Sequence, residues 1–152
     1  MAAFSTEVTF FLTNDYAGTK KRLASNGAST WPVMADESSR DSAQEWYLRR
    51  QPIEHFYSMH TRALGDGQAL DVYNDAGTES TRVIFAVIGD YSGQFWRFDS
   101  WGDGTYRLSN NFTGRGVTLD TYADTLQPFL DTGDHTGQHW TFTAAQKPGR
   151  QA

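Results

Sequence analysis

Two aspartates that each follow a leucine are the residues of this chain best suited to binding chemistry. They lie in the segments Leu70-Asp71-Val72-Tyr73 and Leu119-Asp120-Thr121-Tyr122. An ionised carboxylate accepts hydrogen bonds from pairs of neighbouring hydroxyl groups, and such charge-assisted bonds are among the stronger ones. Two such carboxylates at matching places in one chain make these positions candidates for binding a ligand rich in hydroxyl groups.

The elements that position these aspartates belong to a sequence repeat. A Gln-x-Trp pattern occurs three times, as Gln44-Glu45-Trp46, Gln94-Phe95-Trp96 and Gln138-His139-Trp140. Upstream, the segment 12–18 matches 108–114 at a constant offset, and a middle copy follows the same frame. Three copies with a period of about 40 to 50 residues indicate a closed pseudo-symmetric fold, because a propeller needs about four or more blades.

Local patterns favour β-structure in every repeat. Short runs of aromatic and β-branched residues alternate with turn residues roughly every 8 to 12 positions. The stretch 37–49 could be taken for a helix, but its Gln-x-Trp is in register with the other two, so we expect no helix there. Phe10, Tyr57 and Tyr106 recur once per repeat, as the tryptophans do. We therefore expect these rings to meet in one core.

Composition excludes several classes of function. The formal net charge of -5 argues against nucleic acid and anionic membranes as partners, because phosphate binding needs a concentrated basic surface. No apolar run approaches the length of a membrane-spanning helix. The first residues lack the features of a secretory signal, so we expect a cytoplasmic protein, with release by a non-classical route left open. The 152 residues include no cysteine, and this length can form one core without disulfides.

Taken together, these motifs resemble the ricin B-chain-like (Gln-x-Trp) β-trefoil lectins, above all the cysteine-free, single-domain fungal members. The resemblance covers residues 6–143, with repeats at approximately 6–50, 53–100 and 102–143 and a C-terminal tail at 144–152. It implies an all-β fold, a β-trefoil in which twelve strands form a six-stranded barrel and three capping hairpins. It also implies up to three sugar sites, related by the pseudo-threefold axis.

The resemblance assigns candidate carbohydrate-binding residues to two repeats. In the third repeat they are a carboxylate, a stacking ring, a polar contact and two loop residues: Asp120, Phe129, Gln127, Asp134 and His135. In the second repeat the carboxylate, the ring and the loop residues are Asp71, Phe85, Asp90 and Tyr91. Phe85 and Phe129 are equivalent in this alignment because each precedes its tryptophan by the same number of residues.

The first repeat departs from this pattern. Ala24 replaces the aspartate and Val33 the ring, so we expect no site of this kind there. Trp31 aligns with Gln127, and an exposed ring at that position would give a different site.

The residue before each Gln-x-Trp also departs from the family. Galactose-binding members commonly have asparagine there, whereas this chain has Ala43, Gly93 and Gly137. The run Gly-Asp-aromatic-Ser/Thr-Gly-Gln, found only in the second and third repeats, either replaces the missing contact or forms a turn. Asp71 and Asp120 could likewise tie a strand end to the glutamine instead of binding ligand.

Signs of catalysis or of a metal or cofactor are weak. His135 and His139 are four residues apart, but the intervening Thr-Gly-Gln is turn-like, so we expect no metal pair. We expect a non-catalytic lectin for glycans ending in galactose or N-acetylgalactosamine, with a homodimer as one source of avidity. The alternative is a protein-binding module such as a protease inhibitor, with segment 75–82 as its contact loop.

Overall fold

The chain forms β-strands and short 3-10 turns only, in a computed structural model that describes residues 6, 8–38, 41–73, 82–121 and 125–145. The strands are β1 (Phe10–Asn14), β2 (Lys21–Ala24), β3 (Val33–Asp36), β4 (Trp46–Arg50), β5 (Tyr57–Thr61), β6 (Gln68–Tyr73), β7 (Arg82–Val87), β8 (Trp96–Ser100), β9 (Tyr106–Asn110), β10 (Gly114–Thr121), β11 (Pro128–Asp131) and β12 (Trp140–Ala144). The 3-10 turns are η1 (Ser42–Gln44), η2 (Gly65–Gly67), η3 (Ser92–Gln94) and η4 (Thr136–Gln138). The described residues of the stretch 37–49 include the 3-10 turn η1 and most of β4 but no α-helix.

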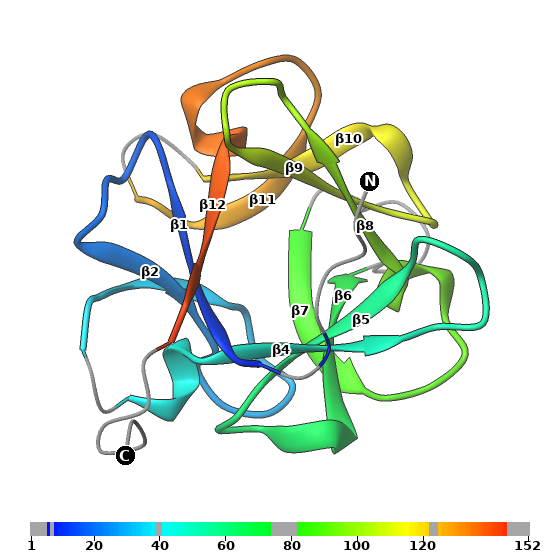
Figure 1. Cartoon of the computed structure of the whole chain (residues 1–152). Helices are drawn as coiled ribbons and strands as arrows, with labels where there is room; N and C mark the ends of the chain where they lie inside the picture. Colours follow the sequence, from blue (N-terminus) through cyan, green and yellow to red (C-terminus); the bar gives the residue numbers. More distant parts are fainter. Residues whose placement is uncertain (1–5, 7, 39–40, 74–81, 122–124, 146–152) are drawn as a thin grey trace.

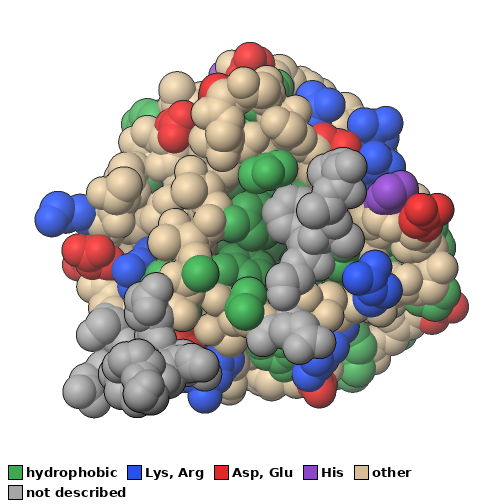
Figure 2. All heavy atoms as spheres, in the orientation of Figure 1, with side chains coloured by type: hydrophobic (Ala, Val, Ile, Leu, Met, Phe, Trp, Pro, Cys, Tyr) green, Lys and Arg blue, Asp and Glu red, His purple; other side chains and the backbone are tan. Residues whose placement is uncertain are grey.

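Six strands close into a barrel. They follow one another in the order β12-β1-β4-β5-β8-β9, and a pairing of β12 with β9 completes the ring. The remaining strands pair as the antiparallel hairpins β2-β3, β6-β7 and β10-β11. The three repeats surround one axis in Figure 1. Apolar side chains gather at the centre of this face in Figure 2, with most charged ones toward its rim. The predicted β-trefoil is confirmed.

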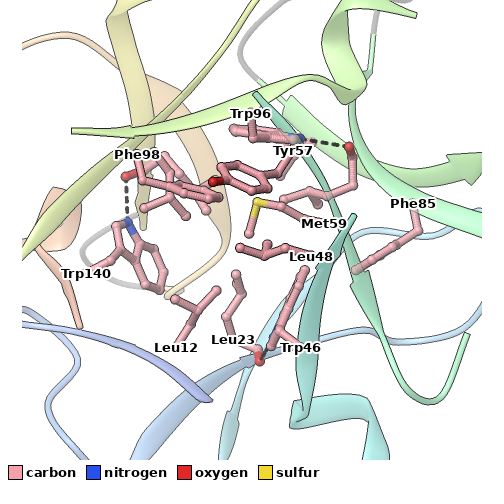
Figure 3. Close-up of a cluster of buried hydrophobic side chains, with 14 of the residues drawn as sticks. Leu12, Leu23, Trp46, Leu48, Tyr57, Met59, Phe85, Trp96, Phe98 and Trp140 are labelled. Atoms are coloured by element: carbon pink, nitrogen blue, oxygen red, sulfur yellow. Dashed lines mark hydrogen bonds between the residues drawn. The ribbon is translucent and has the colours of Figure 1, made fainter. Parts of the chain in front are cut away.

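The expected aromatic core pairs one ring with one tryptophan in each repeat. The strand register places Phe10 opposite Trp46, Tyr57 opposite Trp96 and Tyr106 opposite Trp140. The three tryptophans are fully buried, and Figure 3 shows them around a cluster of leucine, methionine and aromatic side chains. This burial of large rings is the main source of the barrel's stability.

Each tryptophan also holds a hairpin to the barrel. The indole Nε1 donates a hydrogen bond to the carbonyl oxygen of a buried leucine that lies in the second strand of the same repeat. The three bonds are Trp46 to Leu23 at 2.8 Å, Trp96 to Leu70 at 2.9 Å and Trp140 to Leu119 at 2.9 Å. Asp71 and Asp120 directly follow two of these leucines, so the bonds fix where their side chains begin.

The glutamine of each Gln-x-Trp is buried and structural. Gln94 donates through Nε2 to the Val87 carbonyl at 2.9 Å and accepts from the Gly89 amide at 3.1 Å. Gln138 makes the same pair of contacts with Asp131 and His135. These bonds anchor the loop that precedes each Gln-x-Trp. In the described part of the chain, no helix has the length and apolar character needed to cross a bilayer.

Replacing Trp140 by phenylalanine should destabilise the protein by about 2 to 4 kcal/mol, because it shrinks a buried ring and leaves the Leu119 carbonyl without its donor. Urea unfolding would show this as a lower midpoint with an unchanged slope. Trp31→Phe serves as control, since Trp31 is only partly buried. Equal losses in the two variants would contradict a structural role for the Trp140 hydrogen bond.

Candidate functional site

Two cavities of about 510 Å³ each lie at equivalent places in the second and third repeats. The first is lined by Asp71, Val72, Asp90, Tyr91, Ser92, Gly93 and Phe112. The second is lined by Asp120, Thr121, Asp134, His135, Thr136, Gly137 and Tyr16, and additionally by Phe129 and Asp131. Every residue of the first cavity has a counterpart in the second. Most of the predicted site residues are therefore brought together, in two matching groups.

In the first cavity, the carboxylate of Asp71 is held by its neighbours. One oxygen accepts from the amide of Val72 at 2.7 Å and the other from Nε2 of Gln94 at 3.2 Å. Burial raises the pKa of Asp71, and these two hydrogen bonds offset only part of that rise. The expected alternative, a tie between the aspartate and the glutamine, is thus real in this repeat.

Asp120 in the second cavity lacks that tie. Its Oδ1 accepts from the amide of Thr121 at 2.7 Å, whereas the side-chain nitrogen of Gln138 donates to backbone carbonyls instead. Burial raises the pKa of Asp120 as well. The two aspartates therefore do not share a hydrogen bond to the glutamine. They share a position in the lining of a cavity.

The glycines before the two glutamines make room for the carboxylates. A Cβ atom on Gly93 would overlap Oδ1 of Asp71, and one on Gly137 would overlap Oδ1 of Asp120. In the first repeat the equivalent residue is Ala43, and there the aspartate is replaced by Ala24. In the second and third repeats the carboxylate thus fills the space that a side chain in place of the glycine would need.

The other glycine of the shared loop run accommodates a ring. A Cβ on Gly89 would collide with the ring of Tyr91, and one on Gly133 would press on the imidazole of His135. Each ring therefore folds back over a glycine at the rim of its cavity. The run Gly-Asp-aromatic-Ser/Thr-Gly-Gln forms a turn and lines a cavity at once.

Sequence reasoning missed one aromatic residue of each cavity, because that residue comes from a neighbouring repeat. Phe112 of the third repeat lines the Asp71 cavity, and Tyr16 of the first repeat lines the Asp120 cavity. Each is 45% exposed. The position of Phe112 and Tyr16 is occupied in the second repeat by Ala63. Its amide donates to the carbonyl of Ser42, the residue before Ala43 of the first repeat. Aspartate, glycine and ring are thus all replaced by alanine at this third place. This joint replacement, visible in the sequence, could have identified the ring positions as part of the two cavities.

The assignment of Phe85 as a stacking ring is wrong. Phe85 is fully buried and packs on Trp46 with ring centroids 5.6 Å apart. The strand register places Ile84 opposite Asp71, as Phe129 stands opposite Asp120. The second repeat has one more residue between this strand and its tryptophan, and a slip of one residue turns a side chain to the other face of a strand. Phe129, by contrast, lines its cavity.

The assignment of Gln127 to the Asp120 site is also wrong. Its side chain donates to the carbonyl of Pro32 in the first repeat at 3.3 Å and lines a separate cavity that also contains Trp31. The β10-β11 register explains this, because Gln127 lies two residues before Phe129, beyond the paired part of the hairpin.

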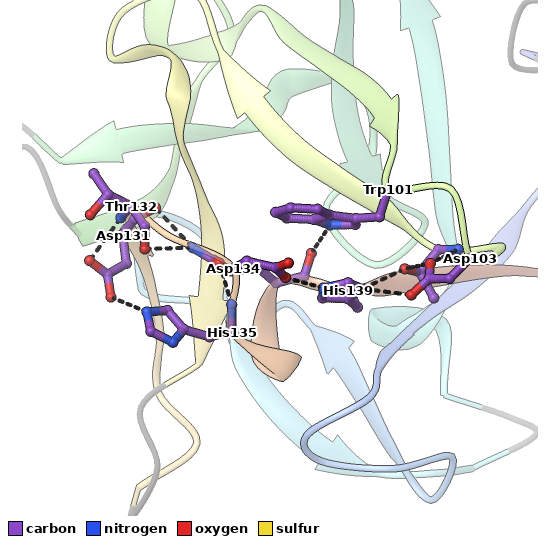
Figure 4. Close-up of polar contacts among 9 residues, drawn as sticks. Trp101, Asp103, Asp131, Thr132, Asp134, His135 and His139 are labelled. Atoms are coloured by element: carbon purple, nitrogen blue, oxygen red, sulfur yellow. Dashed lines mark hydrogen bonds and ion pairs between the residues drawn. The ribbon is translucent and has the colours of Figure 1, made fainter.

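Asp134 reaches its cavity from a hydrogen-bonded cluster around His139 (Figure 4). Nε2 of His139 lies 2.5 Å from Asp134, and Nδ1 lies 3.0 Å from Asp103. The ring stacks on Trp101 at 4.5 Å. Burial alone would lower the pKa of His139, but the two carboxylates outweigh it and raise the pKa. His139 therefore connects the Asp134 loop to the β8-β9 connection through these two contacts.

His135 and His139 face different carboxylate groups. His135 lies with Asp120 and Asp131, and His139 with Asp15 and Asp103, with ligand-type atoms within 4.8 Å of one another in each group. Both groups offer donor types that metal ions accept, but the two histidines do not form a pair.

Gly137→Ala should lower the free energy of unfolding by about 1 to 3 kcal/mol, because the methyl group displaces a buried carboxylate. Adding Asp120→Ala should recover much of this loss, giving a coupling energy of about 0.5 to 3 kcal/mol in a double-mutant cycle. Gly116→Ala is a matched control, since a Cβ at Gly116 meets open space. Additive effects of the two site substitutions would argue against the shared space.

Solved structures with the same fold include chains that consist almost entirely of it and longer chains that contain it as one part. The designed 3-fold symmetric protein ThreeFoil matches with a TM-score of 0.73, 23% identity and coverage of 89% of this chain and 97% of its own. SeviL, solved bound to asialo-GM1 saccharide, matches with a TM-score of 0.69, 14% identity and coverage of 91% and 98%. A GlcNAcα1-4Gal-releasing endo-β-galactosidase from Clostridium perfringens matches with a TM-score of 0.75 and 12% identity, and the match covers 92% of this chain and 33% of the enzyme. This chain therefore spans about a third of that enzyme.

Sequence comparison gives the family. No curated protein sequence is similar enough to count as a match. A family model described as ricin-type beta-trefoil lectin domain-like matches residues 42–128, which is more than half of the chain. With the three Gln-x-Trp repeats and the β-trefoil in place, the chain belongs to the ricin-type β-trefoil lectin domain-like family.

Proposed function

We propose that the protein is a non-catalytic lectin that binds glycans ending in galactose or N-acetylgalactosamine at the Asp71 and Asp120 cavities. One observation carries the proposal. The aspartate, the glycine that makes room for it and the ring from the adjoining repeat occur together twice, and at the third equivalent place all three are alanine: Ala24, Ala43 and Ala63. A purely structural set would be needed three times.

The chemistry of the two cavities suits a galactose-type sugar. Each carboxylate accepts hydrogen bonds from adjacent hydroxyl groups at the cavity floor. The exposed rings of Phe112 and Tyr16 offer flat apolar faces to the C–H side of the sugar, which an axial hydroxyl leaves open. Asp90 with Tyr91 and Asp134 with His135 supply polar rim contacts.

Two open sites of this kind would bind single sugars weakly, with dissociation constants on the order of millimolar to tens of micromolar. Two sites per chain would raise the avidity for branched or clustered glycans, and a homodimer would raise it further. Duplication also supports binding over catalysis, because a catalytic pair of carboxylates seldom needs a second copy. The alternative contact loop for a protein partner, 75–82, lies outside the described residues except for Arg82.

The double variant Asp71→Ala/Asp120→Ala should lose binding to galactose-terminated and N-acetylgalactosamine-terminated glycans on a glycan array, because both carboxylate floors are gone. Each single variant should keep one site and lose avidity. Asp36→Ala is the matched control, since this exposed aspartate lies in the first repeat and pairs with Lys21. Circular dichroism would show that all variants are folded. An array on which the wild-type protein binds no glycan would overturn the proposal.

Sugar binding should weaken in acid at a higher pH than an ordinary aspartate would give. Burial raises the pKa of both carboxyl groups above 3.8, so each becomes neutral earlier as the pH falls. Affinity should be full at neutral pH and decline through the raised pKa values. Calorimetric titration over a pH series, with circular dichroism as the folding check, measures this. Affinity that stays constant down to pH 4 would count against carboxylate recognition.

A further inference from the structure

A third cavity, of about 230 Å³, lies apart from both aspartates and is lined by residues of all three repeats. Its lining consists of Trp31, Arg82, Val83, Gln127 and Pro128. Strand register makes three of these equivalent. Ala24 faces Val33, Asp71 faces Ile84 and Asp120 faces Phe129, and Trp31, Arg82 and Gln127 each lie two residues before those partners. Since equivalent positions of three repeats meet in one place, the cavity lies at the pseudo-threefold axis.

The three equivalent residues differ in side-chain chemistry. Trp31 contributes a large ring, Arg82 a cation and Gln127 an amide. The Arg82 guanidinium lies 4.7 Å from the centre of the Trp31 ring, and Trp31 meets Tyr73 edge to face at 5.4 Å. An arginine stacked on a ring keeps its N–H groups in the guanidinium plane, where they remain able to donate.

Neighbouring contacts hold the cavity in shape. Nε2 of Gln127 donates to the carbonyl of Pro32 at 3.3 Å and joins the third repeat to the first. The amide of Phe85 donates to the carbonyl of Thr30 at 2.9 Å and joins the second repeat to the first. Phe129 pairs with Arg82 across β11 and β7. The three lining side chains therefore start from a backbone that links all three repeats.

We propose that this axial cavity binds a small organic carboxylate of monosaccharide size, such as a uronic acid. The guanidinium fork of Arg82 matches a carboxylate in a bidentate pair. Trp31 and Val83 supply apolar surface, and the amide of Gln127 supplies a polar group for a hydroxyl. The volume is below the roughly 300 to 1,000 Å³ of sites for drug-sized ligands. Among the described residues, no carboxylate forms an ion pair with Arg82.

Titration of the full chain with glucuronate, followed by calorimetry and by the NMR signals of the tryptophan indoles, tests the site. Glucose is the neutral probe of similar shape. Wild-type protein should bind glucuronate saturably, and R82Q should weaken binding roughly tenfold or more, because bonds to a charged group are lost. R82K, which keeps the charge without the fork, should recover only part of the affinity.

Arg50→Gln is the matched control, because Arg50 is also an exposed arginine near a ring, at 5.8 Å from the centre of Tyr57. It should leave glucuronate binding unchanged. The variant Asp71→Ala/Asp120→Ala should bind glucuronate as the wild type does, whether or not the two lectin sites are real. Equal binding of glucose, equal losses in R50Q and R82Q, or no saturable binding to the wild type would each overturn the axial site.

Discussion

The hydrogen bond from each buried tryptophan to a leucine carbonyl is the constraint on which the rest of the structure depends. The tryptophan side chain fills the barrel, and the leucine belongs to a strand of the hairpin. The hydrogen bond therefore joins the barrel to the hairpin. Because an indole N–H buried without a partner is costly, the relative position of barrel and hairpin is fixed in all three repeats. A residue directly after the leucine, such as Asp71 or Asp120, then has a set place above the Gln-x-Trp loop.

Space and charge decide what that place can hold. A carboxylate fits only where the facing residue is glycine, as Gly93 and Gly137 are. It also loses hydration, which is why burial raises the pKa values of both aspartates. A protein that only needed to fill this space would do so at lower cost with alanine, as Ala24 and Ala43 do. Keeping two partly desolvated carboxylates therefore fits a selected role better than a packing role.

The sequence could predict the features that repeat locally. The Gln-x-Trp period, the leucine-aspartate pair and the ring positions led to the β-trefoil and to both aspartates. It could not place Phe85, because an extra loop residue shifted the alignment by one and strand faces alternate with a period of two. Nor could it assign Tyr16 and Phe112 to cavities of other repeats, since that requires knowing which loops adjoin around the axis. Gln127 was misassigned for the same reason, as its neighbours belong to the first and second repeats.

Both cavities are built by two neighbouring repeats, so the sequence repeat and the structural unit that forms a cavity are not the same. The Asp120 cavity is completed by Tyr16, so residues near the two ends of the chain meet in one site. Neither cavity is built by one repeat alone, so a substitution at Phe112 or Tyr16 changes the cavity of a neighbouring repeat. Each cavity is thus gained or lost as a feature of two neighbouring repeats together. The cavity of the last repeat forms only when the first repeat packs beside it and the barrel is closed.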